Sequence, residues 1–263
     1  MEKSVQRRNH SMDLQVSPYT LALTFVLVLI GIFISYKEKL GTAKEILYSV
    51  FRAVIQLVII GYVLTYLFKV NNTIVTLSMV LVIAFNASYH AHKRSHNMPN
   101  SLKISMISIF TSAFLTIGIL VISGSIKFIP SQIVPISGMV CGNAMTTIGL
   151  CYKNLNSLFR DQRQQILEKL SLGATPKQAS ASILRESIKS GMQPSLDSAK
   201  TLGIVTLPGM MSGLMFAGAL PLTAIMYQIM VTMMLVATTS ISSYIASSLA
   251  QKEFFNEQKQ LRI

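Results

Sequence analysis

The sequence of 263 residues is poor in charge: Asp, Glu, Lys and Arg make up only 13% of it, and 10 residues are acidic. Soluble globular domains carry about 25% charged residues, which keep their surfaces hydrated. Hydrophobic residues account for 51% of the chain. The shortage of charge excludes an ordinary soluble domain and predicts an integral membrane protein.

Several features that would signal chemistry are also missing. The only cysteines, Cys141 and Cys151, lie within or at the end of one apolar run, which makes a disulfide between them implausible. No Asp or Glu interrupts the apolar runs, and this disfavours a proton-coupled or cation-coupled carrier, because such carriers usually depend on these groups. The phosphate-binding pattern G-x-x-x-x-G-K-[ST] is absent, so the chain is not by itself a P-loop ATPase.

Long apolar stretches dominate what is present. A helix needs about 20 mostly apolar residues to cross a bilayer. The stretches of this kind fall at roughly 18–36, 46–68, 73–91, 102–123, 132–152, 201–219 and 221–248. We therefore expect an all-α integral membrane protein with about seven transmembrane helices.

The stretches also divide the chain into segments of one domain. A polar amino-terminal arm, 1–17, precedes spans one to five in 18–152. A cytosolic segment, 153–200, separates these from spans six and seven in 201–248, and a cytosolic tail, 249–263, ends the chain.

The basic residues set the predicted orientation. The net charge is +13, but Lys and Arg are spread through the short segments between apolar runs, so a nucleic-acid partner is not indicated. Most of the 23 basic residues fall on one side of the predicted topology. The positive-inside rule then predicts a multi-pass protein of the plasma or inner membrane, with the amino terminus outside and the carboxy terminus cytosolic. The basic residues of the amino-terminal arm argue locally for the opposite orientation.

The segment 153–200 contains a strong turn signal. Gly173 is suited to end one helix in the left-handed conformation. Thr175 can cap the next helix, with Pro176 at its first position and Gln178 completing a capping box. This pattern predicts a tight helix-turn-helix on the cytosolic side. The alternative is an ordinary amphipathic connector that lies on the membrane surface.

Two polar residues in the second span are candidates for a pathway or gating role. Arg52 and Gln56 are four residues apart and share one helix face. An Arg is costly in hydrocarbon, so Arg52 is expected to face the bundle interior, a cavity or the interface, unless its side chain snorkels to the cytosolic surface. Gln56 lies deeper, and an interhelical hydrogen bond is the simpler role for it.

The later spans hold further candidates. Asn143 is an amide that should be hydrogen-bonded or lie on the substrate path, and Pro208 frees backbone carbonyls that a neighbour or a cavity must satisfy. Met145 and Met211 belong to a Met-rich region; thioethers suit soft ions such as copper(I), although Met more often serves as an apolar filler.

A histidine cluster offers a weaker metal candidate. His90, His92 and His96 lie at the cytosolic end of the third span, with basic residues interleaved. Their spacing matches no closed metal site, so a solvated loop is the favoured interpretation.

Several further sequence motifs are distributed along the chain. The stretch Gly173-Ala174-Thr175-Pro176 is similar to the cytosolic coupling loop of ABC permeases, with Glu168 one residue closer to the glycine than in the consensus. The other motifs are RAVIQL at 52–57, GNAM at 142–145, LPGMMSG at 207–213 and AGALPLTAIMYQI at 217–229. Together these motifs resemble those of FetB-type ABC transporter permeases, over nearly the whole chain except the first 17 residues or so. That family includes a bacterial iron exporter and plant relatives linked to aluminium tolerance.

The resemblance implies a permease that pairs with a second copy of itself and with a separate ABC ATPase subunit. Such a permease would export metal ions, iron first among them, and ATP would be used by the partner. The chain itself would bind no cofactor and carry no catalytic residue, and its metal-binding residues stay unknown. The docking residues implied for the coupling loop are Glu168, Gly173, Ala174, Thr175, Pro176 and Gln178.

Two other classes remain open at this point. A secondary carrier or channel would transport its substrate without ATP. A membrane-bound sensor or assembly factor would use the loop only to dock another protein.

Overall fold

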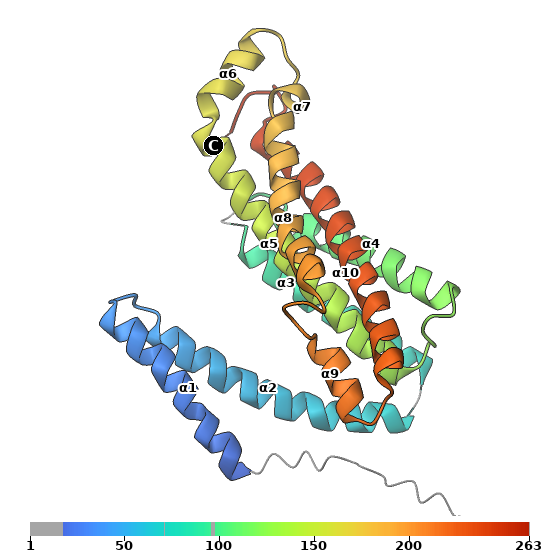
Figure 1. The fold of residues 1–263 in the computed structure, drawn as a ribbon. Coiled ribbons are helices and arrows are strands. Elements are labelled where there is room, and N and C mark those ends of the chain that lie inside the picture. Colours follow the sequence, from blue (N-terminus) through green and yellow to red (C-terminus); the bar gives the residue numbers. More distant parts are fainter. Residues whose placement is uncertain (1–17, 71, 96–97, 263) are drawn as a thin grey trace, which may run out of the picture. The chain divides into compact units, whose positions relative to one another are not determined.

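The computed structural model describes residues 18–70, 72–95 and 98–262, and within these parts it contains helices and no β-strand (Figure 1). The chain is an all-α integral membrane protein, as predicted. The amino-terminal arm 1–17 and His96 lie outside the described residues.

The described residues form two compact units, the first comprising 18–70 with Gly213–Leu220 and the second 72–95, 98–212 and 221–262. In the first unit, α1 (Pro18–Lys37) packs against α2 (Ala43–Val70). A tight turn joins these two helices, and a hydrogen bond of 2.9 Å between the hydroxyls of Ser35 and Thr42 closes it.

The second unit is built around one long helix. This helix, α5 (Pro130–Asp161), packs against α3 (Thr73–Lys93), α4 (Ser101–Ile122), α8 (Ala181–Thr201) and α10 (Pro221–Ala250) (Figure 1). Its inward side chains are fully buried, including Ile148, Tyr152, Leu155 and Phe159. The core of the unit therefore runs along α5.

Hydroxyl groups are a second feature of this core. Ser108 and Thr116 of α4 and Thr238 of α10 are buried and donate to backbone carbonyls of their own helices. The Thr238 hydroxyl also lies 3.3 Å from that of Thr116, and Tyr152 of α5 lies 2.9 Å from the Ser105 hydroxyl of α4. Small side chains with satisfied hydroxyls let helices approach closely in an apolar medium, where few polar groups can be left unpaired.

Three short helices and a 3₁₀ turn complete the structure: α6 (Arg163–Ser171), α7 (Pro176–Ala179), α9 (Gly209–Phe216) and η1 (Gln251–Phe254). Residues 153–200 are therefore helical almost throughout, because α5 continues to Asp161 and α8 begins at Ala181. The boundary of the cytosolic segment remains a prediction.

Among the described residues, five helices are long and apolar enough to cross a membrane: Ala43–Phe68, Thr73–Lys93, Ser101–Ile122, Pro130–Asp161 and Pro221–Phe254. The helix α1 is a shorter apolar helix over Ala22–Lys37. These six correspond to six of the seven expected spans.

The expected span at 201–219 is not formed as a single helix, which corrects the sequence prediction. The helix α8 ends at Thr201, and α9 has only 8 residues. Between them the chain makes a compact turn, in which the Gly203 N–H donates to the Thr206 carbonyl over 2.9 Å. Pro208 has no N–H to continue a helical ladder, and Gly203 takes a left-handed φ of 79°. The apolar composition of this stretch therefore does not correspond to one continuous helix.

Candidate functional site

The turn between α6 and α7 has the caps that the sequence predicts. Gly173 follows the end of α6 with a left-handed φ of 88°. Thr175 caps α7: its Oγ1 accepts from the Gln178 N–H at 3.4 Å, and its own N–H donates to Gln178 Oε1 at 2.9 Å. Pro176 occupies the first helical turn, where its missing N–H costs no hydrogen bond. The predicted capping box and helix-turn-helix are confirmed.

The outer surface of this turn is exposed and contains a large apolar side chain. Leu172 is 88% exposed, and Gly173, Thr175 and Gln178 are exposed beside it. Glu168 lies one helical turn earlier on α6, also exposed, and accepts from Gln164 Nε2 at 3.3 Å. Ala174 is half-buried. We call residues 168–178 the elbow. Apart from Leu172, the exposed side chains of the elbow are polar or small.

The base of the elbow is anchored to the end of α10. Gln251 Nε2 donates to the buried Ser180 hydroxyl at 2.6 Å, and that hydroxyl donates to the Pro176 carbonyl at 2.6 Å. Phe254 stacks on Phe159 of α5, with ring centroids 4.0 Å apart and the planes 2° from parallel. The elbow is thus joined through Ser180 to Gln251 at the end of α10, and the same end of α10 packs on α5 through Phe254.

A partly polar cavity lies farther along the same helices, where α5, α8 and α10 meet. Its volume is about 360 Å³. The residues that line it are Asn143, Pro194, Ser195, Ser198, Ala199, Leu202, Pro208, Gln228, Thr232, Leu235 and Val236. Two of the predicted pathway candidates, Asn143 and Pro208, are therefore brought together.

Two amides give the cavity its polar character. Asn143 Nδ2 donates to the Met139 carbonyl of its own helix at 2.8 Å. Gln228 Nε2 donates to the Thr232 hydroxyl at 3.4 Å, while its Oε1 is buried without a hydrogen-bond partner among the described residues. A buried unpaired oxygen is unfavourable, so a water or a ligand has a favourable place here. Gln228 was not predicted, although an amide inside the apolar run at 221–248 was an available signal.

The other predicted pathway residues lie elsewhere. Arg52 and Gln56 are exposed on α2, in the first unit, whereas Asn143 belongs to the second. Met145 of α5 is half-buried and packs against the hydrophobic core, and Met211 is half-buried on α9. None of these four residues lines the cavity. Roles for Arg52 and Gln56 remain predictions.

The helix α8 lies along α5 in an antiparallel direction. Asn154 Nδ2 of α5 donates to the Glu186 carbonyl at 3.4 Å, and Cys151 Sγ donates to the Ser187 carbonyl at 3.5 Å. One turn on, Gly191 faces Cys151 so closely that a Cβ atom there would overlap the sulfur. The next turns of α8 reach the cavity that Asn143 lines.

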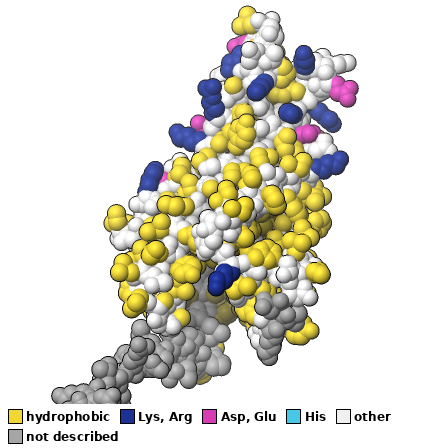
Figure 2. Space-filling model, turned by 90° about the vertical axis from the view of Figure 1, so that its right-hand side faces the viewer, with side chains coloured by type: hydrophobic (Ala, Val, Ile, Leu, Met, Phe, Trp, Pro, Cys, Tyr) yellow, Lys and Arg dark blue, Asp and Glu magenta, His cyan; other side chains and the backbone are white. Residues whose placement is uncertain are grey.

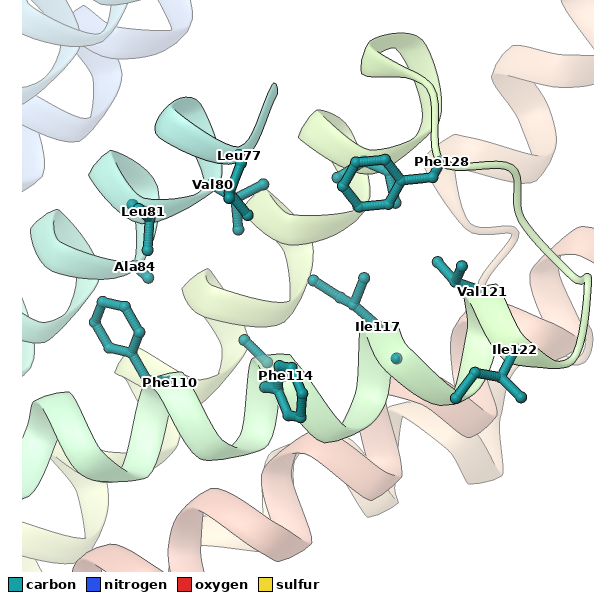
Figure 3. A pocket seen from close by; sticks show the side chains of 13 residues that line it. Leu77, Val80, Leu81, Ala84, Phe110, Phe114, Ile117, Val121, Ile122 and Phe128 are labelled. Atoms are coloured by element: carbon teal, nitrogen blue, oxygen red, sulfur yellow. The ribbon is translucent and has the colours of Figure 1, made fainter. Parts of the chain in front are cut away.

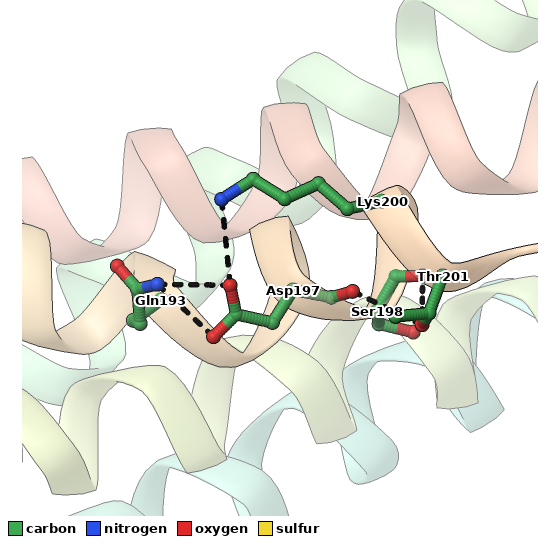
Figure 4. Close-up of polar contacts among 5 residues, drawn as sticks. All are labelled: Gln193, Asp197, Ser198, Lys200 and Thr201. Carbon is green, nitrogen blue, oxygen red and sulfur yellow. Dashed lines mark hydrogen bonds and ion pairs between the residues drawn. The ribbon is translucent and has the colours of Figure 1, made fainter. Parts of the chain in front are cut away.

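A polar network occupies the exposed face of α8 (Figure 4). Gln193 Nε2 donates to both carboxylate oxygens of Asp197, at 2.9 and 3.0 Å, and Lys200 Nζ lies 3.5 Å from Asp197 Oδ1. The Asp197 and Lys200 side chains are 55% and 71% exposed. Sequence reasoning did not single out these residues, because it assigned 153–200 to the cytosol.

Two further pockets are unsuited to a hard metal ion. Figure 3 shows the pocket between α3, α4 and α5, with Leu77, Phe110, Phe114 and Phe128 around it. Its volume is about 320 Å³, and every residue lining it is apolar or glycine. A pocket of about 460 Å³ between α4 and α10 is lined mainly by apolar residues, including four Met, and no cluster of three His, Cys, Asp or Glu occurs among the described residues.

Comparison with known proteins bears on the whole described region. The model of a family described as Uncharacterised protein family (UPF0014) matches residues 18–255. The chain belongs to this family. The match spans the elbow, the cavity and the α8 face, so these features lie in the part of this UPF0014 protein that defines its family.

Individual relatives agree with the family match. Over 242 residues the UPF0014 chain is 54% identical to "Probable iron export permease protein FetB" of Escherichia coli (strain K12), which covers 92% of this chain and 93% of that protein. It is 35% identical to "Protein ALUMINUM SENSITIVE 3" of Arabidopsis thaliana, over 92% of this chain and 88% of that protein. It is 37% identical to "UPF0014 membrane protein STAR2" of Oryza sativa subsp. japonica, over 89% and 82%. No solved structure matches the chain. The resemblance to FetB-type proteins is confirmed.

Proposed function

We propose that this UPF0014 protein is the membrane permease subunit of an ATP-binding cassette transporter that exports metal ions, with iron as the first candidate. ATP would be bound and hydrolysed by a separate subunit. The similarity to a protein named as a probable iron export permease supports the transport role and the cargo. The observation that supports a separate ATPase most directly is the elbow.

A coupling element has two physical requirements. It must be rigid, so that closure of an ATPase subunit is not absorbed by local bending, and it must be joined to the spans that move. The capping box satisfies the first requirement, because it pairs backbone N–H groups that would otherwise be free at the start of α7. The bonds from Gln251 to Ser180 and from Ser180 to the Pro176 carbonyl support the second.

Charge supports a cytosolic position for the elbow. Figure 2 shows Lys and Arg side chains gathered around the end of the protein that carries α6 and α7, with hydrophobic side chains over much of the remaining visible surface. The carboxy-terminal residues lie at the same end, since Phe254 packs on Phe159. We propose a plasma or inner membrane location with this end inside the cell and the amino terminus outside. Two permease copies and the ATPase would form the working assembly.

The test uses Leu172→Asp in the full chain. Burying a Leu side chain in an interface contributes about 1.5–3 kcal/mol, so an Asp in its place should weaken binding at least tenfold. Co-purification of the ATPase subunit with the detergent-solubilised chain measures this. Leu40→Asp is the matched control, because Leu40 is 59% exposed in the turn between α1 and α2, which the predicted topology places on the same side of the membrane.

We expect the wild type and Leu40→Asp to retain the ATPase and Leu172→Asp to lose it. If no ATPase co-purifies with the wild type, the proposal fails. Iron transport by vesicles that lack the ATPase would instead identify a carrier or channel.

A further inference from the structure

The position of α8 against α5 fixes the depth of its polar face. Gly191 is in contact with Thr147 and Cys151, which lie within the apolar part of α5. Asp197 is six residues farther along α8, about 9 Å at the rise of an α-helix. Ser195 and Ser198 flank Asp197 and share a cavity with Asn143. Asn143 stands near the middle of the apolar stretch 132–152, so Asp197 lies close to the middle of the membrane.

Lipid is an unsuitable neighbour for this part of α8. Charged side chains at the centre of a bilayer are strongly unfavourable and, where they occur, face a bundle interior or a water-filled cavity. The exposed face carries Gln193, Asp197 and Lys200, and α8 is not among the described helices that are apolar enough to cross a membrane. Its opposite side borders the partly polar cavity. At mid-membrane depth α8 is therefore polar on both sides, which is the condition of a helix beside water.

The side chains on the exposed face of α8 indicate which kind of solute would bind beside this helix. The Asp197 carboxylate holds a negative charge that Gln193 orients and Lys200 neutralises. The separation of 3.5 Å from Lys200 and the exposure of both side chains leave this ammonium group replaceable. A carboxylate with amide and hydroxyl neighbours suits a hard divalent cation, such as Mn²⁺ or Fe²⁺, better than a soft one.

We propose that the Gln193, Asp197 and Lys200 face of α8 lines the passage of a divalent cation. Asp197 contacts the cation near the middle of the membrane. Lys200 is the counter-charge of Asp197 when no cation is present and is displaced when one arrives. The inference rests on the proposed transport function, but its site is tested without ATP or an ATPase.

The first experiment measures Mn²⁺ binding to the full chain in lipid nanodiscs, by the electron paramagnetic resonance signal of free Mn²⁺. We expect Asp197→Asn to weaken binding at least tenfold and Asp197→Glu to restore most of it. Lys200→Gln should strengthen binding severalfold, because the competing cation is gone. Glu186→Gln is the matched control: Glu186 is exposed on the same face of α8, but near the cytosolic end beside Asn154.

The opposite directions expected for Asp197→Asn and Lys200→Gln separate a binding role from a structural one. If both substitutions lower Mn²⁺ affinity together, or if Asp197→Asn binds like the wild type, the inference is wrong. The ABC proposal is untouched by that outcome, because it depends on co-purification of the ATPase with the elbow intact.

The second experiment tests for water beside α8. Gln193→Cys should react with a charged, membrane-impermeant thiol reagent present on both sides of the membrane of vesicles, because reaction requires a hydrated thiolate. Phe114→Cys, at a position 79% exposed on the membrane-spanning α4, should stay unlabelled in lipid. The native Cys141 and Cys151 are buried and give a low background. Equal protection of both introduced cysteines would exclude a water-filled passage along this face.

Discussion

Single side chains determine how closely α8 approaches α5. Gly191 is the contact point, and the space that a Cβ would need there is filled by Cys151 Sγ, with the Thr147 carbonyl at 3.3 Å. The backbone of Thr147 cannot move without disturbing α5, which is the center of the second unit. A glycine is required at this position because of packing, since its φ is not left-handed.

We expect Gly191→Ala to destabilise the protein by about 1–3 kcal/mol through overpacking. Thermal unfolding in detergent measures the effect. Gly142→Ala is the control, because a Cβ at Gly142 meets no atom within 4 Å. The double substitution Gly191→Ala with Cys151→Ala should recover part of the loss, since it removes the sulfur that clashes. A Gly191→Ala protein as stable as the control would contradict the observed contact.

Residues differ in how readily the sequence reveals them. The cap formed by Thr175 and Gln178 was predictable because all its members lie within four residues of one another, and local geometry decides it. The position of Asp197 was not predictable from the sequence. It depends on contacts of Gly191 with residues of α5 that lie 40 or more positions earlier in the chain. Asn143 and Pro208 were singled out separately, yet only the packing of α5, α8 and α10 shows that they share a cavity.

Among the elements, α7 and η1 form the joint between the elbow and α10. The joint depends on Gln251, which is 6% exposed and whose amide donates to Ser180. Replacing Gln251 by Leu keeps the volume of the side chain but removes the donor. The Ser180 hydroxyl keeps its bond to the Pro176 carbonyl, so the substitution removes one hydrogen bond, which contributes about 0.5–1.5 kcal/mol.

We expect Gln251→Leu to leave ATPase co-purification intact and to lower ATP-driven metal export severalfold, because the elbow still docks but transmits less force. Metal uptake into inverted vesicles per ATP hydrolysed is the measurement, since inversion puts the cytosolic face outside. Glu257→Gln serves as the control, since Glu257 is exposed in the tail beyond this joint. Loss of export in parallel with loss of the ATPase would show that Gln251 supports docking rather than transmission.

The elements also show where hydropathy misleads. The stretch 201–219 is apolar enough for a span, but Gly203 and Pro208 divide it, and α9 covers only Gly209–Phe216. Conversely, α8 is too polar to be predicted as a span, although it packs along α5 and α10. A hydropathy scale predicts whether a helix is stable when lipid surrounds it. A helix that is buried against other helices can be more polar than such a scale requires.

For the whole molecule, orientation in the membrane is the property most open to a direct test. The positive-inside rule places the turn after α4 outside and the elbow inside. We expect Ser125→Cys to be labelled by an impermeant thiol reagent in intact cells and Leu172→Cys to be labelled only after permeabilisation. Both positions are exposed, so access by the reagent depends on the side of the membrane. Labelling of Leu172→Cys in intact cells would reverse the orientation and remove the elbow from the reach of a cytosolic ATPase.

The antiparallel position of α8 between α5 and α10 has a consequence for biosynthesis. A helix with Asp197 and Lys200 on its exposed face is not expected to leave the translocon for lipid on its own, because each of these charges opposes insertion. It needs α5, already made, and α10, which follows it in the chain. Nascent chains that end before Pro221 should therefore hold α8 outside the bilayer. Insertion of α10, the last long helix to be synthesised, would then allow α8 to enter the membrane. The polar face of α8 would therefore reach its final position at the end of assembly.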